Sequence, residues 1–155
     1  MGHSFRPSFG VTRAALAAAV VQGAQVPQYV AAQPQFTDVR DLLTRNFVES
    51  VQAAPSGALF SDTQDNRFQP NALADRLTAA IVLVRAAGLR GEAEAQANAS
   101  LPFTDTASIP AQWRGYVAVA LARGLLKPGN KTFRPQTALT RLELAQALVV
   151  LQRIS

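Results

Sequence analysis

Apolar residues recur at helical spacing in two stretches of the chain. In the stretch 112–126, QWRGYVAVALARGLL, the apolar positions at i, i+4, i+7 and i+8 are Trp113, Val117, Ala120 and Leu121. This spacing places them on one face of an α-helix, and Gly124 follows where a helix C-cap is expected. The stretch 46–59, NFVESVQAAPSGAL, matches this pattern with Phe47 in the place of Trp113, if small insertions are allowed. Both stretches are therefore predicted to be helical.

The start of a second kind of helix is predicted by its capping residue. Residues 140–143 read Thr-Arg-Leu-Glu, a capping box in which threonine accepts a backbone hydrogen bond and glutamate reaches back to the cap. Asp75 and Thr12 are capping residue types at the matching places. Alanine- and leucine-rich helices are predicted to follow, ending near Gly23, near Gly88 and at the end of the chain. No convincing strand of more than a few residues is found.

These helices belong to an internal repeat. A phrase that opens Phe-x-Pro and carries an arginine occurs three times, with equivalent positions Phe5, Phe68 and Phe133; Pro7, Pro70 and Pro135; and Arg13, Arg76 and Arg141. A phrase Phe-Thr-Asp opens at Phe36 and Phe103, and none precedes the first copy. We therefore predict half of a first unit at 5–25, a second unit at 36–89 and a third at 102–155.

The units are expected to share one core, because a chain of 155 residues with 48% hydrophobic content suits one compact domain. The segment 90–101 between the second and third units is polar and alanine-rich and has no apolar face. It is predicted to be a linker or a solvated helical extension.

The charge balance points to an anionic partner. The formal net charge is +5, and every basic residue except Lys127 and Lys131 is an arginine, whose planar fork pairs with carboxylate or phosphate. Nucleic acid is disfavoured because the chain has no dense basic run and the arginines are interleaved with ten acids. Membrane insertion is not expected, since the apolar run 14–21 is too short to span a bilayer.

Catalysis and cofactor binding are not predicted. The chain has no cysteine, and His3 is its only histidine, so neither a Ser-His-Asp triad nor a metal site with histidine and thiolate ligands is expected. Asp62, Asp65 and Asn66 have a composition that could hold calcium, but they lack the full ligand spacing and the closing glutamate.

The combined motifs resemble the S-layer homology (SLH) domain. The residues that carry the resemblance best are Phe103, Asp105, Trp113, Gly124, Phe133, Pro135, Thr140, Arg141 and Glu143. The resemblance implies an all-helical bundle in which three loop-helix-loop-helix units wind around a pseudo-threefold axis. It also implies non-catalytic anchoring of exported proteins, outside the cell at the wall or S-layer surface, by binding an acidic, pyruvylated secondary cell wall polysaccharide. Any signal peptide is expected to lie outside this chain.

In that family, residues of neighbouring units line grooves between units. The matching positions here, which we take as candidate glycan-binding residues, are Arg13, Arg76, Arg141, Asp38, Asp105 and Trp113. The loop KPGNK adds Lys127 and Lys131, which could present cations to an anion. Only the third unit has the full Thr-Arg-x-Glu motif, since the first reads Thr-Arg-Ala-Ala and the second Asp-Arg-Leu-Thr.

Each candidate also has a structural interpretation. The arginines could pair with neighbouring carboxylates, Trp113 could pack in the core, and Asp38 and Asp105 could cap backbone N–H groups of their loops. The lysines could simply be solvated. The alternative function is a degenerate SLH tail of a larger secreted protein, for example a hydrolase, acting as a structural or protein-interaction module.

The incomplete first unit leads to a further expectation. If three units close the threefold core, the chain should show an exposed apolar seam where the missing helix belongs, or a self-association that fills it.

Overall fold

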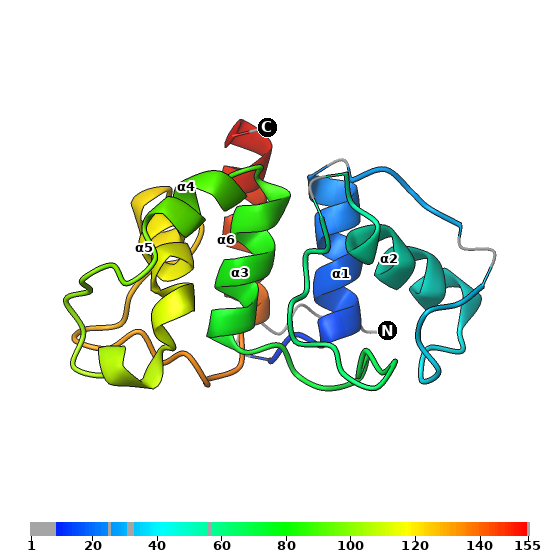
Figure 1. Ribbon diagram of the computed structural model, residues 1–155, viewed down its shortest axis with the longest axis horizontal. Helices are drawn as coiled ribbons and strands as arrows, with labels where there is room; N and C mark the ends of the chain where they lie inside the picture. The colour runs from blue at the N-terminus through cyan, green and yellow to red at the C-terminus, as the bar shows by residue number, and fades with distance from the viewer. Residues whose placement is uncertain (1–8, 25, 31–32, 56, 155) are drawn as a thin grey trace, which may run out of the picture.

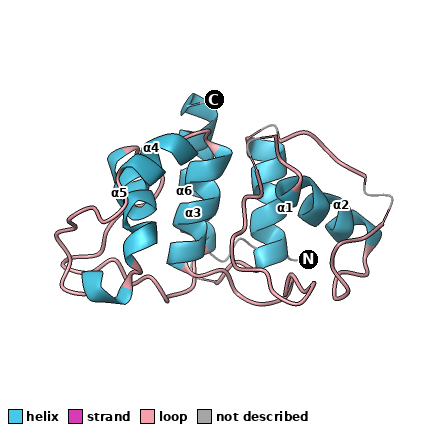
Figure 2. Cartoon of the chain, in the orientation of Figure 1, coloured by secondary structure: helices cyan, strands magenta, loops and turns pink. Residues whose placement is uncertain are grey.

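The computed structural model describes residues 9–24, 26–30, 33–55 and 57–154, and in this part of the chain the regular structure is helical (Figure 1). The α-helices are α1 (Arg13–Gly23), α2 (Leu42–Gln52), α3 (Arg76–Ala86), α4 (Arg90–Ala95), α5 (Arg114–Ala122) and α6 (Arg141–Ile154). Two short 3₁₀ helices, η1 (Thr106–Ser108) and η2 (Ala111–Trp113), precede α5. Figure 2 shows that loops connect them and that no strand occurs among the described residues. The predicted all-α class is confirmed.

The predicted caps start α1, α3 and α6. The side chains of Thr12 and Asp75 each accept a hydrogen bond from the backbone N–H three residues on, at 3.1 and 2.8 Å. At α6 both arms of the capping box form: the N–H of Glu143 donates to Thr140 at 3.1 Å, and the N–H of Thr140 donates to Glu143 at 2.9 Å. These bonds satisfy backbone donors that a helix start leaves without partners.

The first helices of the units differ from prediction at their starts. α2 begins at Leu42, ahead of the predicted 46, because Asp41 accepts from the N–H of Thr44 at 2.9 Å and so caps an earlier turn. α5 begins one residue after Trp113, which lies in the 3₁₀ turn η2. Gly124 has φ +75° immediately beyond the C-cap of α5, as its predicted role requires.

Backbone hydrogen bonds between equivalent positions of the units form a closed ring. The N–H of Val11 donates to Leu139 at 2.9 Å, that of Leu139 to Ala74 at 2.8 Å, and that of Ala74 to Val11 at 2.8 Å. Each of these residues directly precedes a capping residue, so the ring joins equivalent positions of the three predicted units. This is the signature of a pseudo-threefold axis.

A second ring of backbone hydrogen bonds runs in the opposite direction around the axis. The donors are the backbone N–H groups of the first residues of α1, α3 and α6. Each donates to a carbonyl oxygen of another unit, at the position four residues before that unit's own helix start. The bonds run from Arg13 to Ala72 at 2.8 Å, from Arg76 to Thr137 at 2.9 Å and from Arg141 to Phe9 at 2.9 Å. The two rings together set the register of the three helix starts.

The units interlock through their helices. The first helix of each unit packs on the second helix of the preceding unit, so α2 lies against α1 and α5 lies against α3, as Figure 1 also shows. α6 lies behind α3 in this view and packs on α1 and α3. Phe68 and Phe133 are fully buried in the shared core, as predicted. Phe5 and Pro7, which open the first copy of the repeated phrase, lie outside the described residues.

The segment 90–101 makes tertiary contacts that its polar composition did not predict. It contains α4, which packs against α5, and Ala93 is fully buried there. The two backbones approach so closely that a Cβ on Gly115 would lie 2.0 Å from the carbonyl oxygen of Ala93. The segment therefore braces α5, and small residues are what permit the contact.

Candidate functional site

The three arginines in register lie at the junctions between units. At the junction of the first and second units, Arg13 is only 6% exposed. Its Nε donates to the carbonyl oxygen of Phe68 at 2.8 Å, and its two terminal nitrogens grip the carboxylate of Asp62, each at 2.8 Å. The guanidinium also lies over the rings of Phe60 and Phe68. All three nitrogens are therefore engaged within the chain.

Arg76 repeats this arrangement at the junction of the second and third units. It is 0% exposed, and its Nε donates to the carbonyl oxygen of Phe133 at 2.8 Å. Nη2 donates to the carbonyl oxygen of Lys127 at 2.6 Å, and Nη1 pairs with Glu143. Burial lowers the pKa of the Arg76 guanidinium, and the nearby charge of Glu143 opposes that effect. The surroundings of Arg13 and Arg76 favour the structural interpretation for both.

Arg141 has a different environment. It is exposed at the start of α6, and its guanidinium lies 5.5 Å from the centroid of the Phe9 ring. It is thus the one of the three whose side chain faces solvent, and the one that belongs to the unit with the complete motif.

Asp38 and Asp105 each organise a Phe-x-Pro loop. Asp38 accepts from the N–H groups of Phe68 and Gln69 at 2.9 and 2.8 Å. Asp105 accepts hydrogen bonds from the N–H groups of Phe133 and Arg134, which begin the next Phe-x-Pro phrase, at 3.0 and 2.9 Å. In both carboxyls partial burial raises the pKa, but the backbone N–H donors outweigh it and the net pKa is lowered.

These carboxylates also explain an unusual backbone. Gln69 and Arg134, the middle residues of the two Phe-x-Pro phrases, have φ +59°, a left-handed conformation that costs free energy for residues with a side chain. Two charge-assisted hydrogen bonds from each aspartate hold the loop in that shape. This geometry favours the capping interpretation for Asp38 and Asp105.

Trp113 forms one wall of a cleft at the junction of the second and third units. The cleft has a volume of about 370 Å³, and its lining comes from both units: Ser61, Asp62, Gln64, Asp75, Leu77, Thr78, Ile81, Gln112 and Trp113. The indole is half-buried against Tyr116, with ring centroids 5.6 Å apart, and Arg85 lies over both rings. The chain therefore holds the indole rigidly at the edge of a polar cleft.

The sequence interpretation missed Arg85. This residue is buried on α3, and its Nε donates to the hydroxyl of Tyr116 at 3.2 Å, while that hydroxyl donates to Glu94 of α4 at 3.1 Å. Arg85 lies in the last turn of a largely apolar helix, and no sequence motif includes it. Its contacts support Trp113 from behind.

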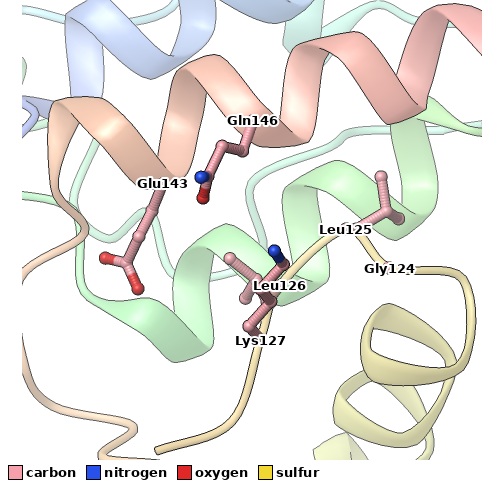
Figure 3. A pocket seen from close by; sticks show the side chains of 6 residues that line it. All are labelled: Gly124, Leu125, Leu126, Lys127, Glu143 and Gln146. Atoms are coloured by element: carbon pink, nitrogen blue, oxygen red, sulfur yellow. The ribbon is translucent and has the colours of Figure 1, made fainter.

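Lys127 and Lys131 are exposed, although their backbones are used structurally. The backbone carbonyl oxygen of Lys131 accepts a hydrogen bond from the N–H of Thr104 at 3.0 Å. The carbonyl oxygen of Lys127 accepts one from the guanidinium of Arg76. Lys127 also borders a small hollow of about 20 Å³ beside α6. Figure 3 shows Glu143 and Gln146 projecting from α6 toward the loop 124–127.

A further hollow lies at the junction of the first and second units. It has a volume of about 290 Å³ and is lined by Ala14, Asp38, Val39, Arg40, Asp41, Thr44, Pro70 and Asn71. It has no indole, because the position that corresponds to Trp113 is Phe47, which packs against the core. The junctions are therefore chemically unequal.

The described residues hold no cluster of three or more His, Cys, Asp or Glu side chains with the geometry of a metal site. Asp62, one of the residues considered for calcium, instead binds Arg13. Among the described helices, none has the length and apolar character needed to cross a bilayer.

The fold and its junctions define a class: an all-α protein of repeated loop-helix-loop-helix units closed around a pseudo-threefold axis. In comparisons with known proteins, residues 102–145 match the model of the S-layer homology domain. The match covers the third unit up to the first turns of α6, and no curated protein matches the chain. An S-layer homology domain is a non-catalytic cell-wall anchoring or binding module, found on proteins of the cell surface or S-layer.

Proposed function

We propose that this chain binds an acidic, pyruvylated secondary cell wall polysaccharide in the grooves between its units, and thereby anchors a protein to the cell envelope without catalysis. The observation that carries the proposal is the cleft of about 370 Å³ between the second and third units, with Trp113 in its wall. A rigid aromatic face beside hydroxyl and amide groups is what a sugar ring needs for stacking and hydrogen bonding.

The polar lining of this cleft supports contact with sugar hydroxyls. Ser61, Gln64, Thr78 and Gln112 can donate and accept hydrogen bonds. The two aspartates of the lining are already engaged, since Asp62 binds Arg13 and Asp75 caps α3, so their charges repel an acidic glycan less than free carboxylates would.

The acidic groups of the glycan would be recognised by exposed cations outside this cleft. Arg141 is exposed and can pair two-pronged with a ketal-linked carboxylate, and Lys127 and Lys131 add exposed cations. Arg13 and Arg76 act indirectly, by holding the junctions whose surfaces form the grooves. Several weak contacts along one polymer would add by multivalency.

The test is co-sedimentation of the purified protein with cell walls that carry a pyruvylated polysaccharide. Arg141→Gln should weaken binding by about tenfold, because a hydrogen bond between charged groups contributes about 1.5–3 kcal/mol. The matched control Arg153→Gln, which removes another exposed arginine from α6, should bind like the parent. Walls treated with mild acid to remove the ketals should bind both proteins weakly. Failure of the parent protein to sediment with walls that retain a proven SLH trimer would refute the function.

A second candidate function is a structural or protein-interaction module at the tail of a larger secreted protein. The burial of Arg13 and Arg76 among internal partners favours it, since it leaves a single exposed arginine of the three in register. In that case Arg141→Gln would change stability at most and leave wall sedimentation unaltered.

A further inference from the structure

Arg85, near the C-terminal end of α3, is a buried cation without an acidic partner. The other buried arginines of the described chain, Arg13 and Arg76, each pair with a carboxylate. Arg85 is only 7% exposed and forms an ion pair with none of the described residues. A buried charge without a counter-charge is costly, so an anion bound at this place would stabilise it.

The hydrogen bonds of Arg85 leave part of its guanidinium unused. Nε donates to the hydroxyl of Tyr116 at 3.2 Å, and Nη1 donates to the carbonyl oxygens of Ala58 and Leu59 at 3.3 and 3.4 Å. These distances lie at or beyond the long end of the usual range for N–H···O bonds. Nη2 donates to none of the described residues. It is therefore available to a carboxylate oxygen.

Arg90, the first residue of α4, brings a second guanidinium to the same place. Its Nη2 donates at 2.7 Å to the carbonyl oxygen of Ala58, which also accepts from Arg85. Nε of Arg90 is buried and has no hydrogen-bond partner among the residues that the structure describes. Two like charges that share one carbonyl oxygen repel each other, and an anion beside them would offset that repulsion.

Arg85 lines a hollow of about 210 Å³, which we call the Arg85 pocket. Its other lining residues are apolar or glycine and come from the ends of α1, α2 and α3 and the loops that follow: Ala24, Val26, Pro27, Ala54, Pro55, Leu59, Ala86 and Gly88. Figure 1 shows α1 and α3 ending on the same side of the molecule. Pockets for drug-sized ligands have volumes of about 300–1,000 Å³, so this smaller one suits a short acyl group.

The buried guanidinium is a feature of one unit and not of the repeat. Counted from the arginine that starts each helix, the position of Arg85 is occupied by Gln22 in α1 and by Val150 in α6. Neither of these side chains carries a charge. The bond to Tyr116 and the stacking on Trp113 account for part of the guanidinium of Arg85, and they leave Nη2 without a role.

We propose that the Arg85 pocket binds a small monocarboxylate with an aliphatic body. The carboxylate would accept a charge-assisted hydrogen bond from Nη2 of Arg85, and the aliphatic part would lie against apolar walls such as Val26 and Leu59. The C-terminal ends of α1, α2 and α3 carry partial negative charge, which offsets part of the guanidinium charge and disfavours anions with more than one charge. Phosphate is therefore a poorer ligand than a carboxylate.

The test is titration of isotope-labelled protein with isovalerate, followed by amide chemical shifts. Saturable shifts should appear at Ala54, Leu59 and Arg85, with a dissociation constant of about 1 mM. Isovaleramide, which lacks the charge, and inorganic phosphate, which lacks the aliphatic body, should each bind at least about tenfold more weakly. No saturable binding of isovalerate, or equal binding of the acid and its amide, would overturn the proposal.

Two substitutions locate the binding. Arg85→Met keeps an aliphatic side chain but removes the charge, and it should weaken isovalerate binding at least about tenfold. Ala86→Leu fills the pocket while Arg85 stays in place, and it should abolish the shifts. The matched control is Ala87→Leu, at the next residue, which is also half-buried but outside the lining and should bind like the parent. Isovalerate binding that survives Ala86→Leu would contradict the proposal.

The same variant separates this pocket from the glycan cleft. Isovalerate should raise the melting temperature of the parent but not that of Ala86→Leu, because a ligand that binds only the folded chain stabilises it. Ala86→Leu should sediment with cell walls as the parent does, and a loss of sedimentation would assign the pocket to the glycan site and overturn the inference. The titration needs no cell walls, so failure of the proposed function would leave its result unaffected.

Discussion

Replacing Arg76 should destabilise the fold far more than replacing Arg141, although the two are equivalent in the repeat. In Arg76→Met, the buried carbonyl oxygen of Phe133 and the partly buried carbonyl oxygen of Lys127 lose their guanidinium donors, and Glu143 loses its partner. A buried polar group left without a partner costs about 1–3 kcal/mol, and breaking a buried ion pair costs about 3–5 kcal/mol. We expect a loss of about 4 kcal/mol, or about 8–16 °C in melting temperature for a chain of this size.

The same change at Arg141 removes an exposed guanidinium and its contact with the Phe9 ring. An exposed cation–π contact contributes about 0.5–1 kcal/mol, so Arg141→Met should cost less than about 1 kcal/mol. Arg76→Lys provides an intermediate, because it keeps the charge but loses the planar fork.

The measurement is urea unfolding followed by far-UV circular dichroism, with the free energy of unfolding compared at equal m-value. If Arg76→Met and Arg141→Met lose the same free energy, the assignment of Arg76 to the core of the junction is wrong. If Arg76→Lys matches the parent, the hydrogen bonds of the fork are not what stabilises the junction.

Further predictions concern the loops and α4. Asp105→Asn should cost about 1 kcal/mol at pH 7, a usual cost of losing a side-chain cap. The pKa of Asp105 is lowered in the fold, so its carboxylate stabilises the fold fully above the ordinary value of 3.8 and this contribution is lost as the pH falls through the lowered folded pKa. The difference between parent and variant in urea unfolding should therefore shrink progressively as the pH falls below 3.8, and a difference independent of pH would contradict the charge-assisted cap. Gly115→Ala should cost about 1–3 kcal/mol, since its Cβ would strike the carbonyl oxygen of Ala93, whereas Gly91→Ala, with no atom within 4 Å, should cost nothing in the same thermal melts. Equal melting temperatures for these two glycine variants would show that α4 does not brace α5.

Local signals were sufficient for much of the fold. The caps at Thr12, Asp75 and Thr140 form as predicted, because a capping side chain and its backbone donor are only three residues apart. The predictions were wrong where the structure of a segment depends on contacts with residues distant in the sequence. α4 packs through Ala93 because Gly115 of α5 admits its backbone, and a polar, alanine-rich segment gives no local sign of that contact.

The candidate site was predictable in position but not in role. Aligning the repeat placed Arg13, Arg76 and Arg141 at equivalent points, and the structure puts all three at unit junctions. Which of them faces solvent depends on the unit that follows each helix, so residue type alone could not distinguish the exposed Arg141 from the other two. Arg85 was missed because an arginine in the last turn of a largely apolar helix resembles a solvated residue until its partners are known.

The sequence by itself determined the helical class and the capped starts of α1, α3 and α6, because these depend on periodicity and on hydrogen bonds within a few residues. Only the tertiary structure decided which copies of the same residue are interior. Valine occupies the equivalent position of α1, α3 and α6, as Val21, Val84 and Val149, yet the first two are buried and the third is half exposed. Burial depends on the helix packed alongside, and that neighbour belongs to another unit of the chain.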